Sequence, residues 1–288
     1  MSQTRNLPKH YELARRIIYA SIALAVIIPY FFNPKQEFKP AIEVERIYDK
    51  IESIRPGGHV LISIDYDPAS EAELYPMTLA IMRHCFKKGV IPVVMTPWPA
   101  SVGIARLGCD EAAADANTMF GKKVVSGEDY VFLGFRPGFG QLFFKMVYNL
   151  KGAFDKDYYG QSTQGMKALE GVDSLKNIDL LVDLAAVGSV EVWIAYGADK
   201  AGIPMAAGTT AVMTPDLYPF YQSNQLMGFL GGLRGAADYE KLLSISGRGE
   251  RGMLAQSATH VLIILLILGA NIRLFFGRFF AGGKGASR

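Results

Sequence analysis

The chain has 288 residues, half of them hydrophobic and 20% charged, a composition typical of a protein that lies partly in lipid. Its formal charge of +3 is unevenly distributed, because residues 34–252 carry 22 Lys and Arg against 26 Asp and Glu, and the basic excess lies in the flanking segments. The mildly acidic middle argues against nucleic acid as a partner, since phosphate binding requires a basic surface.

The first long apolar stretch follows a basic tail, residues 1–16. Residues 17–34 carry no charge, and these eighteen residues would span about 27 Å as a helix, close to the thickness of the hydrocarbon layer. A cleaved signal peptide is the alternative interpretation. The stretch ends in aromatic residues and has no small-x-small cleavage site after it, so we expect an uncleaved transmembrane helix.

A second apolar stretch, residues 253–272, carries no charge over twenty residues and predicts a second transmembrane helix. Residues 273–288 are basic and aromatic, which suits the headgroup layer. Two spans place both basic tails on one side of the membrane. The density of Lys and Arg in these tails predicts a two-pass protein of the cell (inner) membrane with cytoplasmic termini and an extracytoplasmic domain.

The segment between the spans has the pattern of an α/β domain. Residues 35–57 place apolar side chains at helical spacing among charges, which predicts an amphipathic connector, and residues 58–246 form the domain itself. A buried strand over 59–65, a helix over 74–86 and a strand over 90–95 make one βαβ unit. The two strands of such a unit are expected to be parallel.

The later elements alternate in the same way, with less regular patterns. We expect, in chain order, a helix over 110–120, a strand over 129–134, a helix over 139–150, a long loop or lid over 151–174, a helix over 175–187, a strand over 190–196 and a last strand over 206–213. The alternation predicts an open, doubly wound, mostly parallel α/β sheet of about five strands, flanked by two transmembrane helices.

Polar residues gather where the predicted strands end. Ligands of open α/β sheets bind beyond the carboxyl ends of the strands, so such residues are candidates for one pocket. The alternative is that these loops are polar because they turn in water. The candidate ligand-binding residues are Asp65, Asp67, Thr96, Arg136, Tyr196, Thr214 and Asp216. No metal-ligand spacing and no cofactor-binding loop is found in the sequence, so neither a metal nor a cofactor is expected.

Asp65-x-Asp67 at a strand end, followed by Thr96 at the next strand end, resembles the opening motifs of haloacid-dehalogenase-like phosphotransferases. In that family one carboxylate is the nucleophile, the second is a general acid, and a metal offsets their charge. The resemblance covers about ten residues. Pro68 departs from the motif, and no matching lysine motif or paired acidic motif follows. The resemblance implies an Asp-dependent, phosphatase-like hydrolase as one alternative function.

Four glycines, Gly228, Gly231, Gly232 and Gly235, recur at short spacing near the end of the domain. On a helix they would form a flat face that lets another helix approach closely. That face would pack either on the domain's own sheet or on a neighbouring subunit.

The leading hypothesis at this point is a non-enzymatic assembly or scaffold subunit of a membrane complex. Its partners would be the lipid bilayer and either further copies of the chain or other membrane subunits. The chain lacks a Gly-x-Ser-x-Gly elbow, a Walker loop and a His-Glu-x-x-His motif, which makes an enzyme the less favoured reading. The alternatives are a ligand-binding or sensory domain with a pocket at the strand ends, and the Asp-dependent hydrolase.

Overall fold

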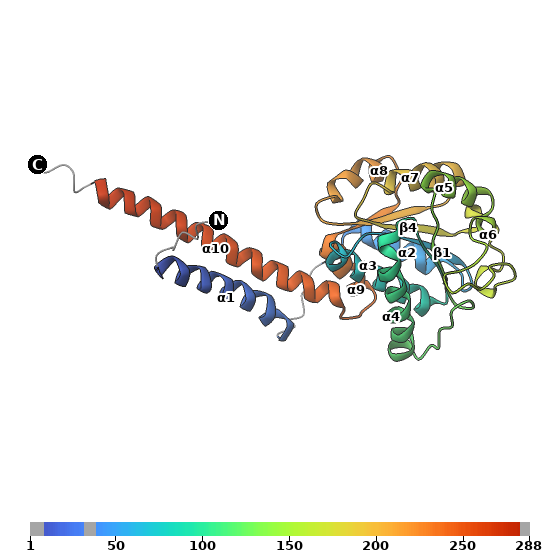
Figure 1. The fold of residues 1–288 in the computed structure, drawn as a ribbon, viewed down its shortest axis with the longest axis horizontal. Helices are drawn as coiled ribbons and strands as arrows, with labels where there is room; N and C mark the ends of the chain where they lie inside the picture. The colour runs from blue at the N-terminus through green and yellow to red at the C-terminus, as the bar shows by residue number, and fades with distance from the viewer. Residues whose placement is uncertain (1–8, 32–38, 283–288) are drawn as a thin grey trace, which may run out of the picture. The chain divides into compact units, whose positions relative to one another are not determined.

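The computed structural model describes residues 9–31 and 39–282 (Figure 1). The chain divides into two compact units. Phe38–Glu250 forms the central domain, and the other unit consists of Met1–Glu37 with Arg251–Arg288. The central domain includes the segment predicted as a connector, because its helix α2, Ile42–Ser53, buries Val44, Ile47 and Ile51 in the domain core.

A single parallel sheet of six strands organises the central domain. The strand order is β3-β2-β1-β4-β5-β6, and every neighbouring pair is parallel. The strands are β1 His59–Asp65, β2 Ile91–Thr96, β3 Val131–Phe135, β4 Leu180–Ala185, β5 Met205–Thr209 and β6 Gly228–Gly231. The order reverses between β1 and β4, and this topological switch point is where doubly wound sheets bind their ligands. The predicted α/β class is confirmed, with six strands instead of about five.

Helices cover both faces of this sheet. The remaining helices of the domain are α3 Glu71–Lys88, α4 Val102–Phe120, α5 Phe139–Tyr148, α6 Leu150–Ala153, α7 Val190–Trp193, α8 Tyr218–Gln222 and α9 Gly232–Leu242. Helices α2, α3, α4 and α9 pack into one hydrophobic core, and α5 and α7 pack into the other. Figure 1 shows the two layers, with α5 and α7 on one side of the sheet and α3, α4 and α9 on the other.

Strand β1 illustrates how the sequence serves both cores. Val60, Ile62 and Ile64 point to the core under α3, whereas Leu61 points to the core under α5. Because side chains alternate along a strand, Ser63 and Asp65 share the face of Leu61. A strand buried on both faces thus carries its three polar residues, His59, Ser63 and Asp65, on one face only.

The βαβ unit and the two elements after α4 are confirmed. β1, α3 and β2 lie where the apolar patterns predict them, and so do β3 and α5. Helix α3 begins at Glu71, three residues before the predicted start, and contains Pro76 in its second turn. The residue before it, Ser70, makes no side-chain capping hydrogen bond. Helix α4 begins at Val102, earlier than predicted.

Two predictions in the second half of the domain are wrong. Residues 175–187 contain β4 rather than a helix, and residues 190–196 are helical rather than a strand, with α7 followed by a π-helical segment, Ile194–Ala201. Short apolar runs fit either structure, because length and periodicity do not separate them. The apolar residues of α7 that suggested a strand, Val190 and Trp193, are buried against the sheet.

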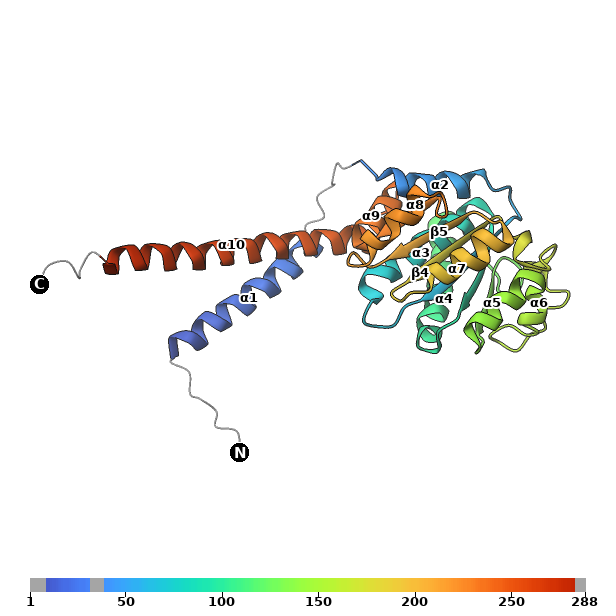
Figure 2. The same ribbon diagram turned by 90° about the horizontal axis from the view of Figure 1, so that it is seen from above.

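The flanking unit contains helix α1, Lys9–Phe31, and helix α10, Arg248–Gly282, from Arg251 onward. Among the described residues one helix is long and apolar enough to cross a membrane, namely α10 over Arg248–Phe275. Helix α1 covers the first predicted span up to Phe31, and the rest of that span lies outside the described residues. Figure 2 shows both helices as continuous coils. The second transmembrane helix is therefore a candidate, and the first remains a prediction.

Candidate functional site

Two carboxylates lie on the same face of the sheet at its switch point. Asp65 is the last residue of β1, and Asp183 lies in β4, the strand beside it. In the register of these strands Ser63 is opposite Asp183, and Asp65 is opposite Ala185. Asp183 shares the face of Ser63 and Asp65, because its neighbours Val182 and Leu184 point to the opposite core. The sheet therefore brings the two acids together.

Both carboxylates are buried, and most of their oxygens lack a partner. Asp65 is 1% exposed and Asp183 is fully buried. Neither carboxylate oxygen of Asp65 accepts a hydrogen bond, and neither does Oδ1 of Asp183. Thr209, the last residue of β5, is also buried with its hydroxyl unpaired. Unpaired polar atoms are costly inside a protein, so a group of them in one place marks a functional site more often than a structural one.

The burial of these acids changes their titration. Burial raises the pKa of Asp65 to about 6. Burial also raises the pKa of Asp183 well above its ordinary value, and the charge of Asp65 raises it further. Two like charges this close cannot both ionise readily in a medium of low polarity. Strongly shifted acids of this kind are typical of functional sites.

One hydrogen bond reaches Asp183 directly, and a second lies beside it. Ser189 donates its hydroxyl proton to Asp183 Oδ2 at 2.9 Å. The Trp193 indole donates to the Ser63 hydroxyl at 3.0 Å, and Ser63 lies opposite Asp183 on β1. Ser189 and Trp193 both belong to the segment that leads from β4 into α7, so this segment positions Asp183.

A pocket of about 400 Å³ adjoins this segment at the carboxyl ends of β2, β3 and β4. Because β1 lies between β2 and β4, the pocket lies over the end of β1. Its walls are mostly apolar, and Ser189 links them to the acidic pair. The lining residues are Pro97, Trp98, Pro99, Phe135, Pro137, Gly138, Phe139, Val187, Gly188 and Ser189.

A more open groove of about 660 Å³ continues from Gly138 along α5. It is lined by Gly138, Gly140, Gln141, Phe144 and Tyr196. The ammonium group of Lys200 lies 4.4 Å from the centre of the Phe144 ring and 5.6 Å from that of Tyr196. The groove and the pocket together give this edge of the sheet an aromatic surface.

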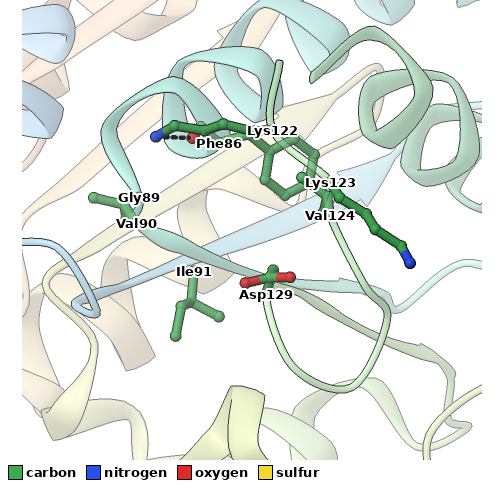
Figure 3. Close-up of a pocket in the computed structure, with 8 residues that line it drawn as sticks. All are labelled: Phe86, Gly89, Val90, Ile91, Lys122, Lys123, Val124 and Asp129. Carbon is green, nitrogen blue, oxygen red and sulfur yellow. Dashed lines mark hydrogen bonds between the residues drawn. The ribbon is translucent and has the colours of Figure 1, made fainter. Parts of the chain in front are cut away.

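A third cavity, of about 240 Å³, lies at the opposite edge of the sheet beside the start of β2 (Figure 3). The Lys122 ammonium donates hydrogen bonds to the carbonyl oxygens of Phe86 and Lys87, and so satisfies the end of helix α3. Asp129 accepts a hydrogen bond from the Val125 amide. These polar groups have structural partners, so this cavity is not the candidate site.

Of the predicted site residues, Asp65 lies in the acidic pair and Thr96 supports the pocket. The Thr96 hydroxyl donates to the Trp98 carbonyl oxygen at 2.8 Å and accepts from the Trp98 amide at 3.0 Å, which fixes the turn that carries Trp98. Asp67 points elsewhere. It is exposed and accepts a hydrogen bond from the Ala69 amide, as turn residues do.

The other four predicted residues do not join the acidic pair. Arg136 donates to the Lys156 carbonyl oxygen at 3.0 Å. Tyr196 lies in the π-helical segment and lines the open groove. Thr214 and Asp216 belong to a 3-10 turn after β5, where the Thr214 hydroxyl donates to the Thr210 carbonyl oxygen.

The four glycines do not form a helix face. Gly228 and Gly231 lie in β6, and Gly232 and Gly235 begin α9. A methyl group at any of them would meet atoms of the same domain, such as the Glu43 carbonyl oxygen for Gly228 and Thr214 for Gly231. Their close packing is therefore internal to the domain.

What the site can do must be read from its geometry, since no family model, no curated protein and no solved structure matches the chain. Among the described residues no group of three His, Cys, Asp or Glu side chains is placed to hold a metal ion. The geometry offers an apolar pocket, a serine at its wall, and behind that serine two buried acids whose oxygens are mostly unpaired. The sequence reasoning missed Asp183, Ser189 and Thr209. The sequence does mark Asp183, because it is a single carboxylate within the apolar run 180–185, and a lone acid in such a run indicates a candidate functional residue.

Proposed function

We propose that this chain is a two-pass membrane protein whose α/β domain binds a small, mostly apolar ligand in the pocket at the ends of β2, β3 and β4. The supporting observation is the position of that pocket beside the switch point of the sheet, with Trp98 and Phe139 in its wall. Binding sites in proteins are typically apolar cavities of this size with a few placed polar groups. Ser189 and the acidic pair behind it are the placed polar groups.

Trp98 gives a direct test of ligand binding. It is 45% exposed in the pocket, whereas the second of the two tryptophans, Trp193, is fully buried. A ligand in the pocket should therefore change Trp98 fluorescence and protect it from acrylamide quenching. We expect hits from a library of small apolar compounds to lose their signal in Trp98→Phe and their affinity in Phe139→Ala. A library that leaves Trp98 equally quenchable, with no shift in unfolding temperature, would remove this proposal.

The membrane arrangement is a second part of the proposal. Its support is the apolar segment of α10, the chargeless residues 17–34 and the basic flanks. Both cysteines of the chain, Cys85 and Cys109, are buried, so the native domain offers a clean background for thiol labelling. A cysteine introduced at exposed Asp216 should react with a membrane-impermeant reagent in intact cells. A residue labelled only after lysis would reverse the proposed orientation.

A role in assembly is the second candidate function, and one observation favours it. Phe144 and Tyr148 are 48% and 59% exposed on α5, with their rings 5.2 Å apart. Both ends of the domain lie on the other layer, because the Ala41 amide donates to Asp238 and the Gly249 amide donates to Glu240, both on α9. The aromatic surface of α5 thus lies on the layer of the domain that does not carry these two ends. Blue-native electrophoresis should show an oligomer that Phe144→Ser with Tyr148→Ser dissociates, and a monomeric wild type would oppose this role.

The hydrolase alternative has the weakest support. Its motif requires two cooperating carboxylates at the end of β1, but Asp67 is exposed and bonded within its own turn. Unchanged turnover of generic phosphate esters in Asp65→Asn would dispose of it.

A further inference from the structure

The acidic pair lacks a positively charged partner. None of the ion pairs of the described residues includes Asp65 or Asp183. The further charge that acts on Asp183 is another carboxylate, Glu191 on α7. Buried charge is normally paired or bound to a metal. The local field at this point of the sheet therefore favours a cation.

Thr209 lies on the same face of the sheet as the two acids. Ala185 on β4 lies opposite Asp65 on one side and opposite Thr209 on the other. Met205 and Ala207 share the face of the acids, and alternation along β5 puts Thr209 on that face too. Within the sheet, the only side chain between Asp65 and Thr209 is the methyl group of Ala185. Asp65 and Thr209 thus flank Ala185, and Asp183 precedes it by two residues on the same face.

The free atoms are those that a metal ion would use. Ser189 occupies Oδ2 of Asp183 and leaves Oδ1 free, while both oxygens of Asp65 and the hydroxyl of Thr209 are unpaired. Hydroxyl and carboxylate oxygens are ligands for hard divalent cations, and Mg²⁺ is commonly held by only one or two carboxylates with further oxygens. Ser189 would orient Asp183, as hydrogen-bonding partners of metal ligands generally do.

The geometry points to a binding site for a hard divalent cation of the Mg²⁺ type, held by Asp65, Asp183 and Thr209 at the switch point of the sheet. The site lies behind Ser189, so it does not require the apolar ligand proposed above. The competing account is a pair of acids that shares a proton and binds nothing. Both accounts predict a folded domain, and only one predicts saturable metal binding.

Trp193 provides the experiment. Its indole bonds to Ser63, directly opposite Asp183, so paramagnetic Mn²⁺ at this site should quench its fluorescence. The full-length Trp98→Phe variant in detergent retains Trp193 as its single tryptophan, so its fluorescence reports on the neighbourhood of the acidic pair. We expect saturable quenching by Mn²⁺, reversal by Mg²⁺ and a higher unfolding temperature with either ion.

Three substitutions in that background separate the outcomes. Asp183→Asn should abolish saturable quenching, and the isosteric Thr209→Val should weaken Mn²⁺ binding by roughly 10- to 100-fold. The matched control Asp67→Asn, an exposed acid two residues from Asp65, should bind Mn²⁺ like its parent. The site is overturned in favour of a shared proton if the folded parent shows no saturable quenching at millimolar Mn²⁺. It is also overturned if Thr209→Val and Asp183→Asn both bind Mn²⁺ as tightly as the parent. Loss of compound binding in Phe139→Ala with intact Mn²⁺ binding would concern the ligand pocket alone.

Discussion

The Ser189 hydroxyl donates to Asp183 Oδ2 at 2.9 Å, and this one bond joins the wall of the apolar pocket to the buried acids. Ser189 is itself 1% exposed, so water does not readily replace the bond when it is lost. The pair Ser189 and Asp183 thus connects a surface that a ligand could touch to a charge that the fold must accommodate.

Replacing Ser189 by alanine should destabilise the domain. The change leaves Oδ2 of Asp183 without a donor, and an unpaired buried acceptor costs about 1–3 kcal/mol. Urea unfolding measures the loss. Ser53→Ala is the matched control, because that hydroxyl bonds to the Lys50 carbonyl oxygen on the exposed side of α2, and it should change stability little. Equal losses in the two variants would show that the Ser189 bond has no special weight.

Replacing Asp65 by asparagine should stabilise the domain at neutral pH in the presence of a chelator. A pKa raised from 3.8 to about 6 corresponds to roughly 3 kcal/mol against the ionised form, so we expect a gain of about 1–3 kcal/mol. The asparagine amide can also donate to Asp183. Substitutions that stabilise a protein while removing its site are common at functional positions.

The pH dependence of this gain has a definite sign. Below about pH 4 Asp65 is protonated in the folded and the unfolded state, so the wild type carries no penalty. As pH rises through about 6 the unfolded state has already released its proton, and the folded state must ionise a buried acid. The advantage of Asp65→Asn should therefore grow between pH 4 and pH 7. Thermal unfolding at several pH values checks this, and an advantage that grows toward acid would contradict it.

A second buried network ties the segment before the sheet to the domain. His84 on α3 bonds through Nδ1 to the Tyr239 hydroxyl at 2.8 Å and through Nε2 to Glu52 at 3.0 Å. Glu52 belongs to α2 and Tyr239 to α9, so three helices meet at one imidazole. Tyr239→Phe leaves Nδ1 without its partner and should cost about 1–2 kcal/mol. Tyr218→Phe, on an exposed ring, is the control, and a similar small loss in both would mean that the network contributes nothing.

The sequence predicted the first half of the domain better than the second, for a physical reason. Helix α3 carries a long apolar stripe between two strands of β-branched residues, and such periodicity admits one interpretation. The run 180–185 is six residues long and fully buried, which suits a strand or a helix equally. Its true structure depends on its neighbours β1 and β5, and no local pattern reports them.

The candidate site was predicted in part for the same reason. Asp65 is the last residue of a strand with a clear apolar pattern, so its position at the carboxyl end of the sheet could be inferred. Asp183 lay within a predicted helix. The last strand was predicted to end at residue 213, so Thr214 and Asp216 were predicted at its end, where the structure has Thr209. The convergence of Asp65, Asp183 and Thr209 depends on strand register, which appears only when the strands are paired.

The glycines near β6 permit a sharp test of internal packing. A Cβ at Gly228 would collide with the Glu43 carbonyl oxygen and lie 2.8 Å from Ile47, and Glu43 and Ile47 belong to α2, whose backbone cannot move without disturbing the core. Gly228→Ala should therefore cost about 1–3 kcal/mol. Gly103→Ala is the matched control, since nothing lies within 4 Å of a Cβ at that helical position, and it should stabilise the domain by up to about 1 kcal/mol. The prediction is contradicted if Gly228→Ala unfolds at the same urea concentration as the wild type. If that variant is also monomeric where the wild type is an oligomer, Gly228 contacts a neighbouring subunit.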